Sequence, residues 1–447
     1  MDTAVLVAEK VQEFTTFLAS LPPAGSEADN IDRIHSIERA KRALSAVQAK
    51  ATHHFVEQRQ THETASNIPT SMQIKGIEAE VGLARGESPF VGAGLTHTAT
   101  ALCTVLPHTL AALETGQVSE YHAKIVAEQT NHLCDAHRRE IDAAINDKLG
   151  QASSTRLRNL IQGHAYRLDR EAANQRAADN ARRRRRICLD PAGEGMMYLT
   201  AELPTHQGVA VMDALTKTTD QRLAATRTTN DAESDSADQQ LGRDQVMADA
   251  FVELLTGQTT AGAVTAEVVV IMHDSTLLGD DDLPGWVLGQ GPLPAGMVKD
   301  WLANPDAAKF LRRLYTRATD GQLVALDSVR RRFPTVLSKM LKLRDDTCAT
   351  PWCNSPAQDI DHRHPWAKGG TTSWANGLGL CKRCNQRKEN RGWTYTGTPD
   401  HLTVTTPTGH QYTVPTKPPI TQIAHHKSGD PPTLQNTTID ISWPTAA

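Results

Sequence analysis

The first half of the chain carries apolar residues at the spacing of amphipathic helices. The runs in which apolar positions recur every three or four residues are 33–60, 98–133 and 135–168. This is the period of a helix with one buried face. Ser119, and Ser153 or its neighbour Ser154, stand where new helices would begin, because a serine hydroxyl can cap the first free N–H groups of a helix. We therefore predict a mainly helical domain over residues 1–225.

Beyond the helical runs, the pattern becomes mixed. Residues 186–204 (RICLDPAGEGMMYLTAELP) predict two short strands on either side of a glycine-containing turn. The acidic and polar segment 224–243 predicts a loose linker. Residues 245–257 predict a helix, and the β-branched run 266–274 (AEVVVIMHD) predicts a buried strand. Residues 226–340 are thus expected to form a linker and a small α+β region.

The last part of the chain alternates over short distances. Residues 393–415 alternate threonine, valine and tyrosine with turn residues, a pattern typical of a small hairpin. Residues 415–447 are rich in proline and weakly patterned, and we expect them to be largely disordered. The predicted parts are the helical domain (1–225), the linker with its α+β region (226–340), a compact module (341–400), and a hairpin with a disordered tail (401–447).

Composition places this organisation in a globular protein. The 447 residues are enough for two or three domains, and hydrophobic and charged contents of 39% and 22% are ordinary values. No run of eighteen apolar residues occurs, so we expect no membrane association. The N-terminal stretch has early acids and no long apolar segment, which predicts no signal peptide. We therefore expect a cytoplasmic location, where thiols stay reduced.

Basic residues are concentrated, although the net charge is −4. Residues 309–344 hold ten lysines or arginines against two acids, and Arg182–Arg186 is an uninterrupted run of five arginines. The first segment is either a solvated helical face or a DNA contact. The arginine run is either a linker or helix end, or a contact to nucleic acid. Because adjacent arginines repel one another, acidic neighbours or an anionic partner must offset the run.

Four of the seven cysteines form two close pairs. Cys348 and Cys353 are separated by four residues, Cys381 and Cys384 by two, and 27 residues lie between the pairs. Thiolates at these spacings can reach one tetrahedral zinc ion. A segment of this length has few large apolar side chains to bury, so zinc binding would supply folding free energy, roughly 10 kcal/mol or more. The cysteine pairs predict a structural zinc site.

Chemically active residues lie between and just after these pairs. In order they are Asp361, His362, Gly369, Gly370, Asn376, Asn385 and Lys388. We expect a short strand through Asp361 and His362, a hairpin turn at the glycine pair, a returning strand, and a helix that begins near Cys381. The predicted local fold is therefore two strands and a helix held together by the zinc site.

This order of residues resembles the HNH endonuclease family, whose fold is the ββα-metal motif. The resemblance covers residues 348–393. Separate stretches at 106–128, 181–204 and 289–295 resemble a helical domain of unknown function that precedes HNH modules in many actinobacterial proteins. The resemblance implies a mainly α N-terminal region with a small α+β part, followed by a zinc-stapled ββα-metal module.

The resemblance also implies roles for single residues. His362 would be the general base that takes a proton from water, and Asn376 would hydrogen-bond across the loop and fix its orientation. Asp361 and Asn385 would hold a catalytic cation, and two oxygen ligands suit Mg²⁺ or Mn²⁺. Arg383, Arg387 and Lys388 could contact DNA phosphates. Gly377 stands where the family usually has an apolar residue.

The expected function is a metal-dependent endonuclease that hydrolyses phosphodiester bonds of DNA, most simply double-stranded DNA. Two alternatives stay open at this point. The first is a zinc-stapled DNA-binding module that does not cleave. The second is an interaction protein in which the helical domain carries the function and the zinc module is only structural.

Overall fold

Helices make up the N-terminal unit, Met1–Ala173, of the computed structural model. The residues that the structure describes are 3–229, 241–258, 260, 270–272, 276–277, 282–287, 289–303, 331–398 and 401–415. In this unit the helices are α1 (Thr3–Ala19), α2 (Glu27–Ala65), η1 (Thr70–Met72), α3 (Ile77–Ala84), α4 (Pro89–Thr104), α5 (Pro107–Glu114), α6 (Glu120–Thr130), α7 (Asp135–Ala144), η2 (Asn146–Lys148) and α8 (Ser154–Leu168). The next helix, α9 (Arg170–Arg183), runs past the boundary.

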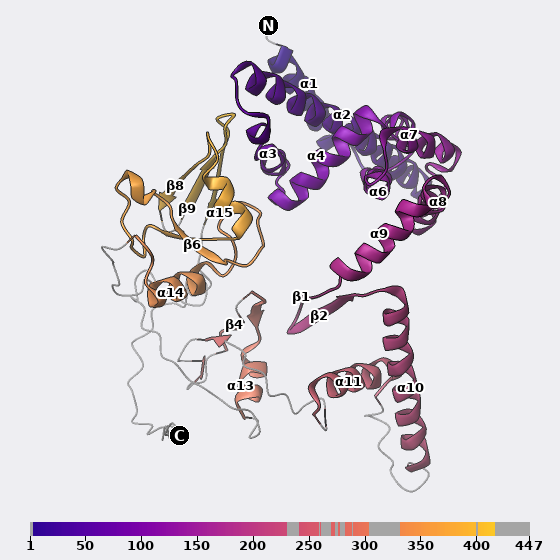
Figure 1. Cartoon of the computed structure of the whole chain (residues 1–447), viewed down its shortest axis with the longest axis vertical. Helices are drawn as coiled ribbons and strands as arrows, with labels where there is room; N and C mark the ends of the chain where they lie inside the picture. The colour runs from indigo at the N-terminus through magenta and orange to yellow at the C-terminus, as the bar shows by residue number, and fades with distance from the viewer. Residues whose placement is uncertain are drawn as a thin grey trace. The chain divides into compact units, whose positions relative to one another are not determined.

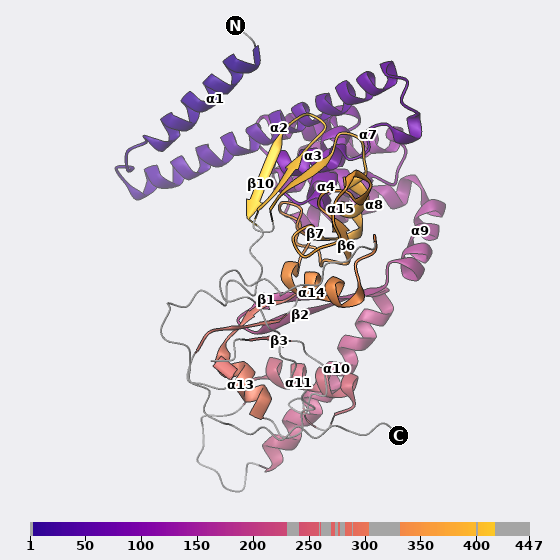
Figure 2. The same cartoon turned by 90° about the vertical axis from the view of Figure 1, so that its left-hand side faces the viewer.

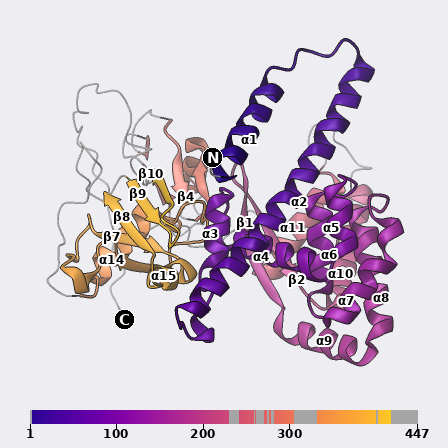
Figure 3. The ribbon, with the colours of Figure 1, turned by 90° about the horizontal axis from the view of Figure 1, so that it is seen from above.

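The core of this unit lies where α4 to α8 pack beside the part of α2 that carries Ala46. Figure 3 shows these shorter helices clustered there, while α1 and the start of α2 extend away from them. The fully buried large side chains of the cluster are Leu102, Leu106, Leu113, Ile125, Ile141, Ile145, Leu157 and Ile161. Ser119 and Ser153 cap α6 and α8 as predicted, since each hydroxyl accepts a backbone N–H three residues on.

The second unit, Asn174–Ala447, begins with a β-hairpin and two helices. Its first elements are β1 (Arg186–Gly193), β2 (Met196–Glu202), α10 (Thr205–Thr229) and α11 (Arg243–Thr256). The strands β1 and β2 pair in antiparallel register around Gly195, which confirms the strands predicted for this stretch. A small antiparallel sheet in the order β3-β4-β5 follows, built from β3 (Val270–Ile271), β4 (Gly285–Val287) and β5 (Gly291–Leu293), and then α13 (Ala295–Ala303).

The C-terminal module joins a helix, a two-stranded sheet, a short helix and a three-stranded sheet (Figure 1). Its elements are α14 (Thr335–Asp345), β6 (Asp359–His362), η3 (Trp366–Lys368), β7 (Gly377–Leu380), α15 (Lys382–Lys388), β8 (Thr394–Thr398), β9 (His401–Thr405) and β10 (Gln411–Pro415). The last three strands form a sheet in the order β10-β9-β8, with β10 at the edge (Figure 2). The predicted fold class, a mainly α region followed by a ββα module, is confirmed.

Two local predictions were wrong. Residues 393–415 form three strands and not a two-stranded hairpin, because the chain turns again after β9 at Gly409, which has a φ of +84°. The glycine pair does not form a hairpin turn either. The strands β6 and β7 are joined by residues 363–376, which include η3, and Gly369 ends that 3₁₀ helix with a φ of +90°.

Several predictions fall partly or wholly outside the described residues. Of the segment 224–243, residues 224–229 continue α10, and residues 230–240 lie outside. Of the expected strand 266–274, the structure places Val270–Ile271 in β3. The tail beyond residue 415 and the basic positions between 309 and 330 also lie outside. The predicted domain boundaries at 225, 340 and 400 stay predictions.

Helix α14 is the main support of the paired strands β6 and β7. Leu337 and Leu341 on this helix are fully buried, and a Cβ added to Gly377 at the start of β7 would collide with Leu341 and lie 3.1 Å from Phe333 Cε1. Arg344 is also buried and donates to the carbonyl oxygens of Trp374 and Gly377, both at 2.7 Å. The glycine at position 377 therefore replaces the usual apolar residue because α14 supplies the packing.

Within the described residues, no single helix has the length and apolar character needed to cross a bilayer. The pair α4 and α5 meets these criteria only when taken together, and the two helices are bent by 106°.

Candidate active site

Four cysteine side chains meet at one point of the C-terminal module. Their Sγ atoms lie within 4.8 Å of one another, and all four residues, Cys348, Cys353, Cys381 and Cys384, are buried. The first pair comes from the loop between α14 and β6, and the second from the start of α15. Four thiolates at this separation fit the tetrahedral, sulfur-rich site that structural zinc prefers. The predicted meeting of the two pairs is confirmed, and the four cysteines are positioned to bind a metal ion.

The thiols interact strongly with one another. A hydrogen bond from the Cys348 thiol lowers the pKa of Cys353 to about 2 and that of Cys381 to about 6, while the pKa of Cys348 itself is raised. Two of the four positions thus favour the thiolate, which is the form that binds a metal ion. Cys381 is also the N-cap of α15, because its Sγ accepts the N–H of Cys384 at 3.4 Å.

The β10-β9-β8 sheet packs beside the four-cysteine cluster. Tyr395 on β8 is buried, and its hydroxyl lies 3.4 Å from Thr350 Oγ1 between the first two cysteines. Arg387 is buried as well, donates to Cys384 Sγ at 3.7 Å and lies over the ring of Trp393. A guanidinium at this place offsets the negative charge of a four-thiolate site.

The strand β6 and the helix α15 face each other through two polar pairs. Asp359 and Asp361 are two residues apart on β6, so their side chains lie on one face of the strand. Asn385 Nδ2 lies 3.3 Å from Asp359 Oδ2, and Lys388 Nζ lies 2.5 Å from Asp361 Oδ2. The structure therefore brings Asn385 and Asp361 to the same face, where Asp359 joins them. Sequence reasoning missed Asp359, although the alternation in "DID" could have indicated it.

His362 lies at the far end of β6 from the cysteines, in a buried position. Its Nε2 lies 2.9 Å from Thr372 Oγ1, and its Nδ1 lies 3.8 Å from Asp361 Oδ1. The ring packs against Phe333, with 4.6 Å between centroids. Burial lowers the pKa of His362, and the nearby Asp361 carboxylate only partly opposes this effect. The imidazole is thus neutral at pH 7 and can accept a proton.

The loop between the strands is held by Asn376. Its Oδ1 accepts the N–H of His364 at 2.7 Å, and its Nδ2 donates to the carbonyl oxygens of His364 and Thr371. A Cβ on Gly370 would collide with the His364 carbonyl, so only glycine fits there. Asn376 therefore bonds across the loop, as the resemblance implies, while the His362 ring is hydrogen-bonded to Thr372.

We expect Thr372→Val to slow any cleavage at this site by roughly 2- to 13-fold, because it removes one hydrogen bond worth roughly 0.5–1.5 kcal/mol and keeps the side-chain shape. If Thr372 positions the ring, kcat falls while KM stays unchanged, and Thr372→Ser restores the rate. Steady-state cleavage kinetics check this.

Thr371→Val is the matched control for that substitution. Thr371 is exposed, and its hydroxyl bonds to Ser373 Oγ at 3.0 Å and not to the imidazole. We expect its rate to stay near that of the wild type. Equal losses in the two valine variants would show that Thr372 acts on loop stability and not on His362.

The three residues of α15 suggested for phosphate contact differ in their surroundings. Lys388 and Arg387 are buried, with partners at Asp361 and Cys384 as described above. Arg383, on the first turn of α15, is exposed. Of the three residues suggested for phosphate contact, Arg383 is thus the one that the structure places on the surface.

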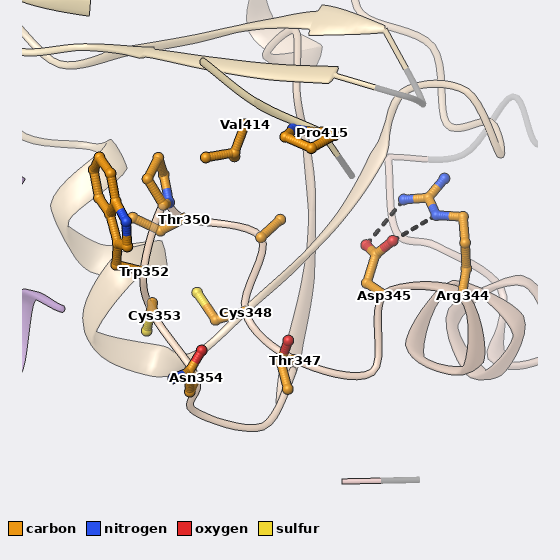
Figure 4. Close-up of a pocket in the computed structure, with 12 residues that line it drawn as sticks. Arg344, Asp345, Thr347, Cys348, Thr350, Trp352, Cys353, Asn354, Val414 and Pro415 are labelled. Atoms are coloured by element: carbon orange, nitrogen blue, oxygen red, sulfur yellow. Dashed lines mark hydrogen bonds and ion pairs between the residues drawn. The ribbon is translucent and has the colours of Figure 1, made fainter. Parts of the chain in front are cut away.

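A pocket of about 210 Å³ opens beside the cysteines. Figure 4 shows Val414 and Pro415 of β10 above the loop that carries Cys348 and Cys353, with the Arg344–Asp345 ion pair to one side. Neither His362 nor Asp361 lines this pocket. The candidate catalytic residues therefore lie where β6 faces α15, outside this pocket.

A family profile described as a domain of unknown function, DUF222, matches residues 32–345, which is more than half of the chain. The chain belongs to the DUF222 family. A second profile, described as HNH endonuclease, matches residues 347–391 directly after the DUF222 region. Searches of curated proteins and of solved structures found no match.

The boundary between the two matches does not coincide with a structural boundary. Helix α14 lies in the DUF222 match, yet its Leu341 and Arg344 pack on β7 of the HNH match. Asp345 Oδ2, also from the DUF222 side, accepts the N–H of Gly379 at 2.6 Å. We call β6, β7 and α15 together the HNH corner. The end of the DUF222 region therefore packs against the HNH corner and supports it.

Proposed function

We propose that the chain is a metal-dependent DNA endonuclease whose active site is the HNH corner. The observation that carries this proposal is the placement of His362 next to Asp361 on the strand β6, which lies in the chain between the two cysteine pairs, with 3.8 Å between His362 Nδ1 and Asp361 Oδ1. The HNH match supports a nuclease-type function in general.

In this proposal His362 takes the proton from the attacking water. In the tautomer whose Nε2–H donates to Thr372 Oγ1, Nδ1 carries the lone pair that receives the proton. A base with a pKa below its ordinary value is in the accepting form at neutral pH. The ring cannot swing away from this place, because Phe333 and Trp366 pack on it with centroid distances of 4.6 and 5.9 Å.

The residues opposite α15 fit a hard divalent cation. Asp361 and Asp359 offer carboxylate oxygens on one strand face, and Asn385 offers an amide across from them. Oxygen donors of this kind suit Mg²⁺ or Mn²⁺. When bound, the cation would stabilise negative charge on the phosphate and the leaving oxygen.

The proposal is tested by the ends of the cleaved DNA. Supercoiled plasmid incubated with the wild-type chain and Mg²⁺ should be nicked, and attack by water with loss of the 3′ oxygen leaves 5′-phosphate and 3′-hydroxyl ends. DNA ligase should therefore seal the nicks. Nicks that ligase cannot seal, or nicking that persists without any divalent cation, would contradict the proposed chemistry.

The alternative is a zinc-stapled DNA-binding protein that does not cleave. The ion pair between Lys388 and Asp361 favours it, because a lysine that never leaves the carboxylate would keep a cation out. The two functions differ in one result. Both predict DNA binding, but only the endonuclease predicts nicking that requires Mg²⁺ or Mn²⁺.

A further inference from the structure

The run of five arginines joins the end of α9 to the start of β1. Arg182 and Arg183 lie in the last turn of α9, and Arg186 is the first residue of β1. All five side chains, including those of Arg184 and Arg185, are exposed. The run lies outside the HNH match, at residues 182–186, and the proposed nuclease mechanism does not use it.

One carboxylate pairs with two of the five arginines. Arg184 Nη2 lies 3.0 Å from Glu202 Oε1, and Arg186 Nε lies 3.0 Å from Glu202 Oε2. Arg184 and Arg186 flank Arg185 in the sequence. Their common partner, Glu202, places both of their side chains on one side of the chain. Alternation along an extended segment places the Arg185 side chain on the other side.

The other three arginines have no such partner. In the described part of the chain, Arg182, Arg183 and Arg185 make no ion pair. Asp179, one turn earlier on α9, makes no ion pair with them there either. The negative end of the α9 dipole can stabilise Arg182 and Arg183, but Arg185 lies beyond the helix. Three neighbouring guanidinium groups are thus left to attract an anion with closely spaced charges.

We propose that Arg182, Arg183 and Arg185 form a binding site for the phosphodiester backbone of DNA, separate from the HNH corner. A guanidinium group has planar donors that match phosphate oxygens, and it keeps its charge at every physiological pH. The choice of DNA rests on the proposed function, because the HNH corner makes a polyphosphate strand the anion on which the chain acts. The site would hold DNA without reading its sequence.

Two double variants with equal charge change test this site. Arg183→Gln with Arg185→Gln removes two arginines that lack a partner, and Arg184→Gln with Arg186→Gln removes the two that share Glu202. Binding of a fluorescein-labelled DNA duplex is measured by anisotropy over a series of NaCl concentrations, without added divalent cation. Circular dichroism shows that both variants keep their helices.

The inference predicts different salt dependence for the two variants. Each lost phosphate contact lowers the slope of log K against log[NaCl] by about 0.9, so the first variant should lose roughly 1.8 from the slope and the second clearly less. Equal losses in both variants, no loss in either, or no binding by the wild type would overturn the inference. So would Arg183- and Arg185-dependent binding to phosphatidylserine vesicles with an unchanged DNA slope, since the site would then hold lipid headgroups.

This experiment separates the inference from the proposed function. If the slopes differ as predicted but the wild type does not nick plasmid, the arginine site stands and the nuclease proposal fails. If the wild type nicks plasmid with Mg²⁺ but both variants keep the wild-type slope, the nuclease proposal stands and the arginine site fails.

Discussion

Replacing Cys381 with serine is expected to release zinc and unfold the C-terminal module while the N-terminal helical unit stays folded. Zinc supplies roughly 10 kcal/mol or more in small zinc modules, and three remaining thiolates cannot complete the tetrahedral site. Serine is itself a good helix N-cap, so the substitution keeps the capping position of α15 and tests ligation alone. Zinc content by mass spectrometry and limited proteolysis of the module measure the effect.

Cys134→Ser is the control for that substitution. Cys134 is exposed, lies in the N-terminal unit and takes no part in the four-cysteine cluster. This variant should keep one zinc per chain and resist proteolysis like the wild type. A Cys381→Ser protein that retained a full equivalent of zinc would show that the four cysteines do not share one ion.

His362→Ala is expected to slow DNA cleavage by about 10²–10⁴-fold, which is the range that a general base contributes. The substitution leaves the four cysteines untouched, so zinc content should stay at the wild-type level. It also opens a cavity beside Phe333 and Trp366, and His362→Asn therefore serves as a second variant that keeps more of the volume. Single-turnover nicking rates on plasmid DNA measure the loss.

The loop supplies a matched histidine for comparison. His364 is exposed, and Asn376 holds it through its backbone N–H and carbonyl oxygen. His364→Ala should therefore keep the loop and change the rate only a few-fold. Comparable losses at positions 362 and 364 would remove the special role assigned to His362.

The sequence was sufficient for the parts of the site that follow from spacing. The spacing of the cysteines predicted that the two pairs come together, and the structure shows their Sγ atoms clustered, because the short spacing within each pair leaves the thiols little freedom. The strands and the helix of the corner were predicted from the same stretch, as was the start of α15 at Cys381. These features depend on local geometry and on few long-range contacts.

What the sequence did not indicate depends on packing between distant segments. The burial of Arg387 follows from Trp393 and from the β8–β10 sheet, which closes the metal site. The hydrogen bond between Thr372 and His362 depends on the path of the loop. The glycine pair suggested that path wrongly, because a Gly-Gly sequence is typical of a tight turn. Gly370 is instead required by the close approach of the His364 carbonyl.

The role of α14 could not be predicted from the sequence either. Its basic residues suggested a solvated or DNA-binding face, yet Arg344 is buried and bonded to Asp345 and to the β7 strand. Residue type alone does not indicate that Arg344 is buried, because two of its hydrogen-bond acceptors are the carbonyl oxygens of Trp374 and Gly377, about thirty residues later in the chain. The helix that ends the DUF222 match thus belongs structurally to the HNH corner.

The most direct test of the account compares plasmid nicking by wild-type protein and by His362→Ala, each with full zinc, in the presence and absence of added Mg²⁺. The account predicts that only the wild type with Mg²⁺ converts supercoiled plasmid to the open circle at an appreciable rate. Equal nicking by the two proteins, or no nicking by the zinc-loaded wild type with either Mg²⁺ or Mn²⁺, would contradict it.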